Sequence, residues 1–597
     1  MNIHDAARKG RAIIIDSILQ SETAKTSDKD SHGNTPILLA SSHGHLAAVE
    51  LLLRRGASVA DRDKRGYTAL LLAASQGHVR VVELLLTMGS DVHERDKKDD
   101  SALLLAAANG YTDIVELLLS FGADVNDRNH RDRTPILMAA MNGHFYVVQL
   151  LLFKGADVNS RDQNEGNSPL ILACREGHFP IANLLAIHGA SVHDRCKMGD
   201  TSIICAARGG FVYIAEMLLL DGANVHDKTK NGDTSLIIAA YNGDIPMVQL
   251  LLAHGATINE RGFNNRTPLI AAASGGHLPV AQMLLLHGAD ANEKDNGAQS
   301  SLIEVCKNGN LQLAILLITF GASVNDVNVH KQTPILEAAR EGHTAIVEFL
   351  VNKGANVNCM DNSGNTPLSY ASLNGDTAMV SALISRGALV QLKDAGGLSA
   401  LLHASLHGKR ALVEHMLALG ANVHDRDIEH NSPLILAARQ GHLSTVELLL
   451  SSHADPRDRN SAGATPLLEA ARMGHISVVD LLLAHGADPN DTDSSGRSSL
   501  VLAMMNGHVG AARSLLQSDK LVFSRKGASG VISPLLTAVR LGYTDIAEYL
   551  IKKGVDVNAV DSLGESALSV ASRQRDADMM TLLIGSGADS AKLSAHD

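Results

Sequence analysis

Residues 35–45, TPILLASSHGH, contain a helix-start signal, a helix-stop signal and two histidines that flank one glycine. The hydroxyl of Thr35 can accept a hydrogen bond from a free N–H group of a first helical turn, and Pro36 suits the first helical position. Gly44 can adopt the left-handed geometry of a helix end. The stretch therefore predicts a short helix with a defined beginning and end. Its histidines pose a question, because they could bind a metal or have a structural role.

The same helix-start and helix-stop residues recur along the whole chain of 597 residues. The Ser or Thr that begins the helix recurs every 33 residues, with one interval of 34 and one of 35. A degenerate unit over residues 2–29 adds one more, so we expect eighteen repeats. The helix-start positions are Thr35, Thr68, Ser101, Thr134, Ser168, Thr201, Thr234, Thr267, Ser300, Thr333, Thr366, Ser399, Ser432, Thr465, Ser498, Ser533 and Ser566.

Each unit also contains a second apolar segment and a polar link. In residues 112–119, TDIVELLL, apolar side chains recur at helical spacing, and Gly122 follows them. The link at residues 122–133, GADVNDRNHRDR, is polar and rich in turn-forming residues. One unit is therefore expected to contain two short helices and a projecting finger.

The words T-P-L, A-A-x-x-G-H, V-x-L-L-L and G-A-D-V-N together resemble the ankyrin-repeat family over essentially the whole chain. The resemblance implies an all-α solenoid of stacked helix pairs with projecting β-hairpin or turn fingers, whose concave surface binds other proteins. The chain departs from the family at the fourth motif residue, which is usually His. Here it is aliphatic, as in Leu38, Leu71, Leu104 and Leu137, so we expect apolar packing in its place.

We expect the chain to be divided into four segments. These are a degenerate capping repeat at residues 1–30, regular repeats at 31–516, an irregular junction at 517–532, and C-terminal repeats with a cap at 533–597. The junction lacks both the helix-end glycine and the GADVN word. Because each repeat in such an array is stabilised chiefly by its neighbours, the junction is expected to be a bend or soft point. The alternative is a recognition patch formed by Leu521, Val522 and Phe523.

Composition limits the classes of function. Acidic residues outnumber basic ones by 64 to 52, which argues against a chain built to neutralise a nucleic-acid backbone. The five cysteines form no disulfide pattern, and Cys174 and Cys306 occupy a slot where other repeats have Ala or Ser, so we expect them in the core. The N-terminal apolar run is too short for a signal peptide or a membrane span. We therefore expect a cytoplasmic or nuclear protein.

The twenty-eight histidines recur in fixed slots of the repeat. Equivalent histidines of neighbouring repeats would lie roughly 10 Å apart, the spacing of packed helices, whereas zinc needs ligands about 2 Å from one centre. We therefore expect a structural role for them. The chain also lacks a nucleophile elbow, an HExxH motif and a phosphate-binding loop. We predict no catalytic, cofactor or metal site, and hence no enzyme. Nine histidines follow the mid-unit glycine, namely His45, His78, His144, His178, His277, His343, His442, His475 and His508.

A column of basic residues recurs at the predicted finger tips, usually beside an acid, as at residues 61–63. One interpretation is a solvated turn with local charge pairing. The other is a register of cations that binds carboxylates or phosphates of a partner. The column contains Arg62, Arg95, Arg128, Arg161, Arg195, Lys228, Arg261, Lys294, Lys393, Arg426 and Arg459.

A second variable column lies just before the mid-unit glycine, where the family resemblance places the groove. Tyr, Arg and Met are favoured at protein interfaces, and aromatic residues are scarce in this chain. Some of the bases have a local alternative, because Glu337 to Arg340 and Glu469 to Arg472 are spaced for ion pairs on one helix. The candidate partner-binding residues are Tyr67, Met141, Arg175, Arg208, Tyr241, Phe263, Arg340, Tyr370, Arg439 and Arg472.

The sequence thus favours a non-catalytic scaffold or adaptor that binds one or more proteins along its concave face. It predicts no nucleic-acid partner and no membrane insertion, and it predicts a chain that is monomeric in itself. The alternative is a secreted or translocated effector that sequesters a host protein through the same surface, since a repeat array does not reveal its location.

Overall fold

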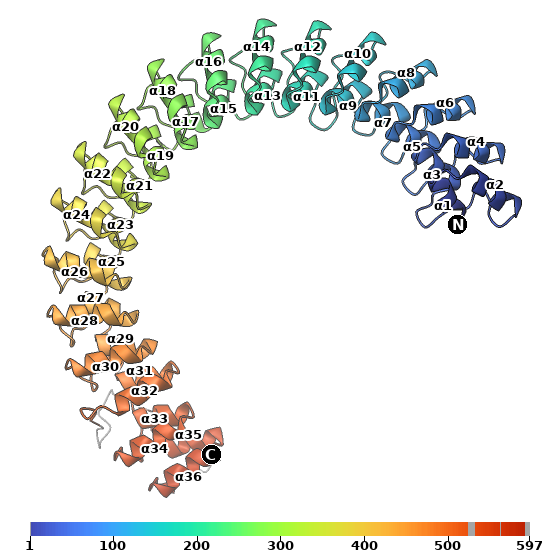
Figure 1. The fold of residues 1–597 in the computed structure, drawn as a ribbon. Helices are drawn as coiled ribbons and strands as arrows, with labels where there is room; N and C mark the ends of the chain where they lie inside the picture. The colour runs from blue at the N-terminus through green and yellow to red at the C-terminus, as the bar shows by residue number, and fades with distance from the viewer. Residues whose placement is uncertain (1, 523–531, 562, 591–597) are drawn as a thin grey trace. The chain divides into compact units, whose positions relative to one another are not determined.

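The computed structural model describes residues 2–522, 532–561 and 563–590. The chain divides into two compact units, Met1–Ser301 (unit 1) and Leu302–Asp597 (unit 2). In both units, the described residues form pairs of short helices that follow one another along the chain (Figure 1). Residues 523–531 of the predicted junction, Phe523 among them, lie outside the described residues.

The helices of unit 1 are paired as first and second helix of each repeat, and one 3-10 turn, η1 (Phe263–Asn265), precedes α17. They are α1 (Ile3–Arg8), α2 (Ala12–Gln20), α3 (Pro36–Ser42), α4 (Leu46–Arg54), α5 (Ala69–Gln76), α6 (Val79–Thr87), α7 (Ala102–Asn109), α8 (Thr112–Ser120), α9 (Pro135–Asn142), α10 (Phe145–Phe153), α11 (Pro169–Glu176), α12 (Phe179–Ile187), α13 (Ser202–Gly209), α14 (Val212–Leu220), α15 (Ser235–Asn242), α16 (Ile245–Ala253), α17 (Pro268–Gly275) and α18 (Leu278–Leu286).

The boundary between the units falls at the first residue of α19, and the same pairing continues through unit 2. The remaining helices are α19 (Ser301–Asn308), α20 (Leu311–Thr319), α21 (Pro334–Arg340), α22 (Thr344–Asn352), α23 (Pro367–Asn374), α24 (Thr377–Ser385), α25 (Ala400–Leu406), α26 (Arg410–Ala418), α27 (Pro433–Arg439), α28 (Leu443–Ser451), α29 (Pro466–Met473), α30 (Ile476–Ala484), α31 (Ser499–Met505), α32 (Val509–Leu516), α33 (Pro534–Arg540), α34 (Thr544–Lys552), α35 (Ala567–Gln574) and α36 (Ala577–Gly585).

The Ser or Thr and the Gly that recur in each unit lie at the predicted ends of the first helices. Thr68 precedes α5, its side chain accepts a hydrogen bond from the N–H of Leu71, and Gly77 ends the helix with a φ of 82°. Most other first helices begin in the same way. Thr35, Thr201, Thr234 and Ser399 also precede helices, but their side chains make no such bond. At Thr35 the helix start therefore depends on Pro36 and on burial rather than on a hydroxyl cap.

The first helices supply most of the core. Six of the eight residues of α5 are buried, but only four of the nine residues of α6. Within each unit the odd-numbered helices pack side by side in one layer, and the even-numbered helices form a second layer against them. In Figure 1 the odd-numbered layer lies on the inner side of the curve of each unit. The predicted all-α solenoid of stacked helix pairs is confirmed.

Among the described residues, the fingers are turns, and six of them are closed by a single bridge. Isolated antiparallel bridges join Arg95 to Ser101, Arg195 to Thr201 and Lys228 to Thr234 in unit 1. Each of these three bridges joins the finger-tip base to the Ser or Thr that begins the next helix. The finger is therefore anchored where the first helix starts.

Slots that sequence patterns assigned to the core are buried. Leu38 and Leu71 have no accessible surface, so apolar packing does replace the histidine that is usual in the family motif. Cys174 and Cys306 are also fully buried, as expected, and burial raises the pKa of both thiols.

Candidate functional site

The histidines after the mid-unit glycines connect neighbouring repeats. The ring Nε2 of His78 donates a hydrogen bond of 3.1 Å to the carbonyl oxygen of Ser42, in the preceding repeat. The same ring covers Gly44, where a Cβ atom would lie 2.5 Å from His78 Nδ1. Equivalent bonds from Nε2 to a carbonyl are made by His45, His144, His178, His277, His343, His442 and His475.

This contact explains why glycine and histidine occur together in the sequence. The glycine needs its left-handed backbone and also leaves room for a ring from the next repeat. Tyr111 covers Gly77 and Phe211 covers Gly177 in the same way, whereas in a few repeats the slot holds a non-aromatic residue, such as Asp244 opposite Gly210 and Lys409 opposite Gly375. Among the described residues, no three His, Cys, Asp or Glu side chains converge on a point that could hold a metal ion.

The finger-tip bases also connect neighbouring repeats. The guanidinium of Arg95 forms an ion pair with Asp127 and donates a hydrogen bond of 2.6 Å to the carbonyl of Arg128, both in the next finger. Sequence patterns suggested pairing within one turn, whereas most of these cations bind the following repeat. The further pairs are Arg161 with Asp194, Arg195 with Asp227, Lys228 with Glu260, Arg261 with Glu293, Lys393 with Asp425, Arg426 with Asp458 and Arg459 with Asp491.

We call these ion pairs between successive fingers the finger ladder, and in unit 1 it is interrupted at Arg128. Asp127 accepts from both Arg95 and the hydroxyl of Ser101. At the equivalent position the next repeat has Ser160, which bonds the hydroxyl of Thr134 at 3.0 Å and offers Arg128 no carboxylate. Arg62 fits the ladder at its beginning, since it donates to the carbonyl of Arg95 at 2.6 Å.

The arginines of the second column lie on the first helices and are held by carboxylates and amides. Arg175 donates to Glu165 at 2.8 Å and to Asn167 at 2.9 Å. Asn167 also donates to Glu165, and the bonds that Glu165 accepts from Asn167 and Arg175 lower its pKa. Arg208 bonds Asp200 at 2.9 Å. These bonds position both cations at the base of the fingers, although the side chain of Arg208 remains 56% exposed.

In unit 2, two arginines of the second column form ion pairs with the glutamates that the sequence predicted as their partners. Arg340 lies 2.6 Å from Glu337, and Arg472 lies 2.6 Å from Glu469. Arg439 of the preceding repeat reaches the same Glu469 at 3.2 Å. The ion pairs expected within each helix are confirmed, and one of them extends across two repeats.

The aromatic candidates divide into two kinds. Tyr370 donates a hydrogen bond of 2.6 Å to Asp361, and burial together with this bond raises the pKa of its hydroxyl to about 12. Tyr67 is half-buried beneath the guanidinium of Arg65, 4.7 Å from its ring centre. Tyr241 is 55% exposed and Phe263 50% exposed. Met141, at the slot of Tyr241 in an earlier repeat, is partly exposed.

One group of this surface, His403, was missed by the sequence interpretation. His403 lies one repeat after Tyr370 in the same slot and contacts Asp394 at 2.9 Å, just as Tyr370 contacts Asp361. Arg540 lies within 3.1 Å of Asp561 and Glu565. His403 could have been found by aligning the fourth residue of each first helix with the acids of each finger, whereas Arg540 belongs to the second column, two residues before Gly542.

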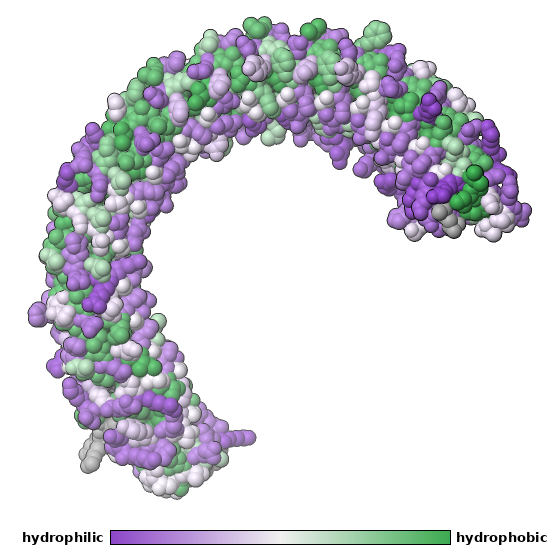
Figure 2. All heavy atoms as spheres, in the orientation of Figure 1, coloured by the Kyte–Doolittle hydropathy of each residue, from purple (hydrophilic) through white to green (hydrophobic). Residues whose placement is uncertain are grey.

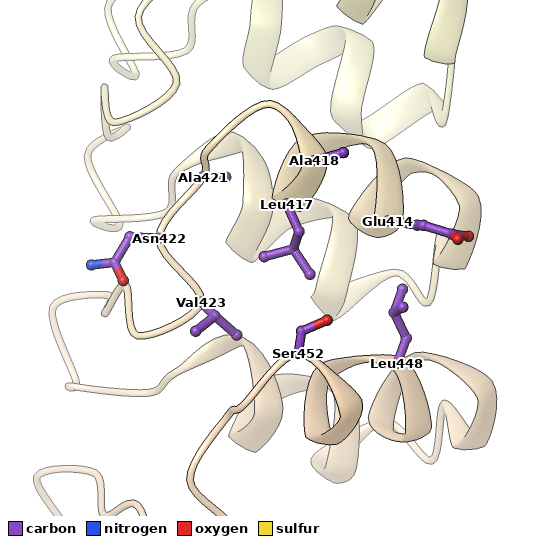
Figure 3. Close-up of a pocket in the computed structure, with 8 residues that line it drawn as sticks. All are labelled: Glu414, Leu417, Ala418, Ala421, Asn422, Val423, Leu448 and Ser452. Carbon is purple, nitrogen blue, oxygen red and sulfur yellow. The ribbon is translucent and has the colours of Figure 1, made fainter.

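A cavity of about 610 Å³ lies between α26 and α28, in the even-numbered layer of unit 2. Figure 3 shows Leu417, Val423 and Leu448 around it, with Glu414, Asn422 and Ser452 at its margin. These groups are not arranged as a nucleophile with a base or as a set of metal ligands. The cavity is a gap between adjacent second helices.

A family model described as ankyrin repeats in three copies matches residues 3–96, 81–162, 160–229, 203–295, 302–394, 401–493, 434–526 and 500–593. The chain belongs to the ankyrin-repeat family. Ankyrin repeats are protein–protein interaction modules, so protein partners are the expected ligands. The comparison with curated proteins gives no match. No helix in the described ranges of this ankyrin-repeat chain has the length and apolar content required to cross a bilayer.

Proposed function

We propose that the chain is a non-catalytic scaffold that binds one or more proteins along the inner surface formed by its odd-numbered helices. The observation that carries this proposal is the pair of half-exposed aromatic rings, Tyr241 and Phe263, on an otherwise polar inner surface. Figure 2 shows hydrophilic residues predominating along the inner side of unit 1. Large rings rimmed by polar groups are typical of the residues that contribute most binding energy.

The polar groups around such rings support the same proposal. Arg175 is held by Glu165 and Asn167, and Arg439 by Glu469 and Asn431. A cation that is already positioned loses little conformational freedom when a partner binds, so it can contribute a hydrogen bond at low entropic cost. The remaining donors of a guanidinium are then available to an approaching carboxylate or carbonyl.

The experiment is an affinity purification from the source cell with the full chain as bait. The test variant carries Tyr241→Ala and Phe263→Ala, which remove exposed rings without removing a core contact. The matched control carries Leu443→Ala and Ile476→Ala, which remove exposed apolar side chains from the even-numbered layer of unit 2. Wild type and control should recover the same proteins, and the test variant should recover at least one of them in much smaller amount.

A test variant that recovers every protein as well as wild type does would contradict the assignment of the inner surface. Equal losses with both variants would also contradict it, because the loss would then not depend on which surface is changed. Circular dichroism of the three proteins checks that each retains its helices.

A further inference from the structure

The second helices α10, α12, α14, α16 and α18 of unit 1 leave large apolar side chains in solvent. We call their solvent-facing surface the outer apolar face. Its largest side chains are between 68% and 82% exposed, and Phe179 adds a ring that is 41% exposed. Figure 2 shows hydrophobic residues gathered along the outer side of unit 1, over the even-numbered helices. The most exposed members are Tyr146, Phe153, Ile187, Tyr213, Leu220 and Leu286.

The same slots are polar in the preceding repeats. The ninth residue of the second helix is Arg54, Thr87 or Ser120 in α4, α6 and α8, whereas it is Phe153 in α10 and Leu220 in α14. The difference is therefore not a property of the fold, because identical positions of the helix are apolar in one region and hydrophilic in another.

The central row of the outer apolar face is also depleted of charge. The fifth residue of the second helix is Glu50, Glu83 and Glu116 in the first regular repeats. In the next five repeats it is mostly an amide, with one acid among them, and these residues are Gln149, Asn183, Glu216, Gln249 and Gln282. A row of four amides and one glutamate, Glu216, thus lies between two rows of apolar side chains.

A helix that is apolar on all sides normally has neighbours on all sides. The second helices of this region pack on their first helices and on each other, yet their outer side faces solvent. At roughly 200 Å² of surface per large side chain, the exposed fractions of the seven named apolar residues amount to about 1,000 Å². The sum covers two rows, so each row exposes several hundred Å², about the size of the largest apolar patch on a typical monomer, which is often functional.

We infer that the outer apolar face binds the same face of a second copy of this chain, forming a two-fold symmetric dimer. Such an interface needs a patch that is complementary to itself. A side-chain amide is both a donor and an acceptor, so a row of Gln and Asn can pair with an identical row. The apolar rows on either side then meet apolar rows.

Charge and area favour a second copy over other occupants. The chain carries a formal net charge of −12, so two copies repel each other over most of their surface. A face nearly without acids is where they can approach at the lowest electrostatic cost. Its area of about 1,000 Å² matches the roughly 800 Å² per partner that a stable interface buries. An anionic membrane would instead require lysines and arginines on this face, and Lys154 is the basic residue that α10 places beside it.

The inference goes beyond the proposed function, because it concerns the even-numbered layer and not the inner surface. It also departs from the monomer expected from the sequence. Sedimentation velocity of the purified full chain over a range of micromolar concentrations measures the association directly. Two variants change the face: Gln149→Glu with Gln249→Glu and Gln282→Glu restores the acids of the first repeats, and Phe153→Ser with Leu220→Ser restores their polarity.

The matched control adds the same charge to exposed positions of unit 2, as Ala418→Glu with Ser451→Glu and Ala484→Glu. We expect wild type and control to sediment as dimers. Both face variants should have a dimer dissociation constant that is higher by roughly tenfold or more. A monomeric wild type would overturn the inference, and so would a dimer that both face variants leave intact. Binding of a monomeric wild type to neutral phosphatidylcholine vesicles, abolished by both variants, would assign the face to lipid.

Discussion

Most repeats have one glycine after the first helix and another after the second, and the surroundings of these two glycines differ sharply. Gly408 ends α25 with a φ of 65°, and a Cβ atom there would lie 2.5 Å from the ring of His442 in the next repeat. Gly420 follows α26 with a φ of 88°, and a Cβ atom there would meet nothing within 4 Å. Neighbouring repeats are therefore held in close contact at the ends of the first helices and not at the ends of the second.

This difference indicates on which surface the residue types can vary from one repeat to the next. At the inner glycines and at the fingers, side chains of one repeat bond the next, so the residue types recur. At outer glycines such as Gly420, no side chain of the next repeat lies within 4 Å of the Cβ position, although finger amides such as Asn358 bond a carbonyl there. This open space allows the ninth residue of the second helix to be polar, as in α4, α6 and α8, or a large apolar residue, as in α10 and α14, within one fold.

The largest effect should separate the two glycines. Gly408→Ala places a side chain in a left-handed conformation, at about 1 kcal/mol, and against the ring of His442, which adds about 1–3 kcal/mol of overpacking. Gly420→Ala should cost only the backbone part, about 1 kcal/mol. Urea denaturation of both variants, with wild type as reference, measures the two losses. Equal losses would show that the ring contact does not restrict the inner glycine.

A smaller effect should come from the ring itself. His442 donates to the carbonyl of Leu406 at 3.0 Å. His442→Phe keeps a flat ring in the slot, as Phe211 does over Gly177, and should lose about 1 kcal/mol for the hydrogen bond. His442→Ala should lose about 2 kcal/mol, because the packing over Gly408 is lost as well. If His442→Phe were as destabilising as His442→Ala, the hydrogen bond would account for the whole contribution.

The finger ladder should give a still smaller, salt-sensitive effect. Arg195 binds Asp227 and the carbonyl of Lys228 in the next finger, whereas Arg128 has Ser160 where a carboxylate would be. Because these side chains are partly exposed, Arg195→Gln should cost about 0.5–1 kcal/mol, less at high salt, and Arg128→Gln close to nothing. The comparison is made from urea midpoints at low and high ionic strength. A loss at Arg128 as large as that at Arg195 would mean that the acid is not the important partner.

The gap can also be repaired. Ser160→Asp would place a carboxylate where Asp127 accepts from Ser101 and Arg95, with Thr134 and Arg128 as the new donors. We expect a gain of about 0.5 kcal/mol that disappears when Arg128→Gln is added. The double-mutant cycle isolates that pair. A gain that survives Arg128→Gln would have another cause.

A pH effect is expected at His403, on the inner surface. Burial lowers the pKa of this imidazole, while Asp394 acts in the opposite direction. Because the folded state favours the neutral ring, its stability is fully present above about pH 6.5 and is lost as the pH falls through the folded pKa. His403→Leu, which installs the residue found at this slot in α3 and α5, should reduce the loss of stability on acidification between pH 7 and pH 5.5, measured by urea midpoints. An unchanged loss would contradict the assignment.

The sequence predicted the parts of the fold that depend on residues beginning and ending a helix within one repeat. The spacing of Thr68 and Gly77 defines a helix from chemistry within one repeat, so those boundaries were readable. The ring of His442 over Gly408 and the pairing of Arg195 with Asp227 depend on how one repeat lies against the next. A period of 33 residues shows that these residues recur, but not which atoms meet. The outer apolar face was visible in the sequence as changes in two slots, from Glu116 to Gln149 and from Ser120 to Phe153.

The central claim is that partner proteins bind the inner surface of the stack. Hydrogen–deuterium exchange of the full chain, alone and with a partner recovered by affinity purification, tests it most directly. The account predicts new protection at the C-terminal ends of odd-numbered helices such as α15 and in the fingers around Phe263, with no new protection in the second helices α10, α12, α14, α16 and α18. New protection confined to the even-numbered helices would contradict it.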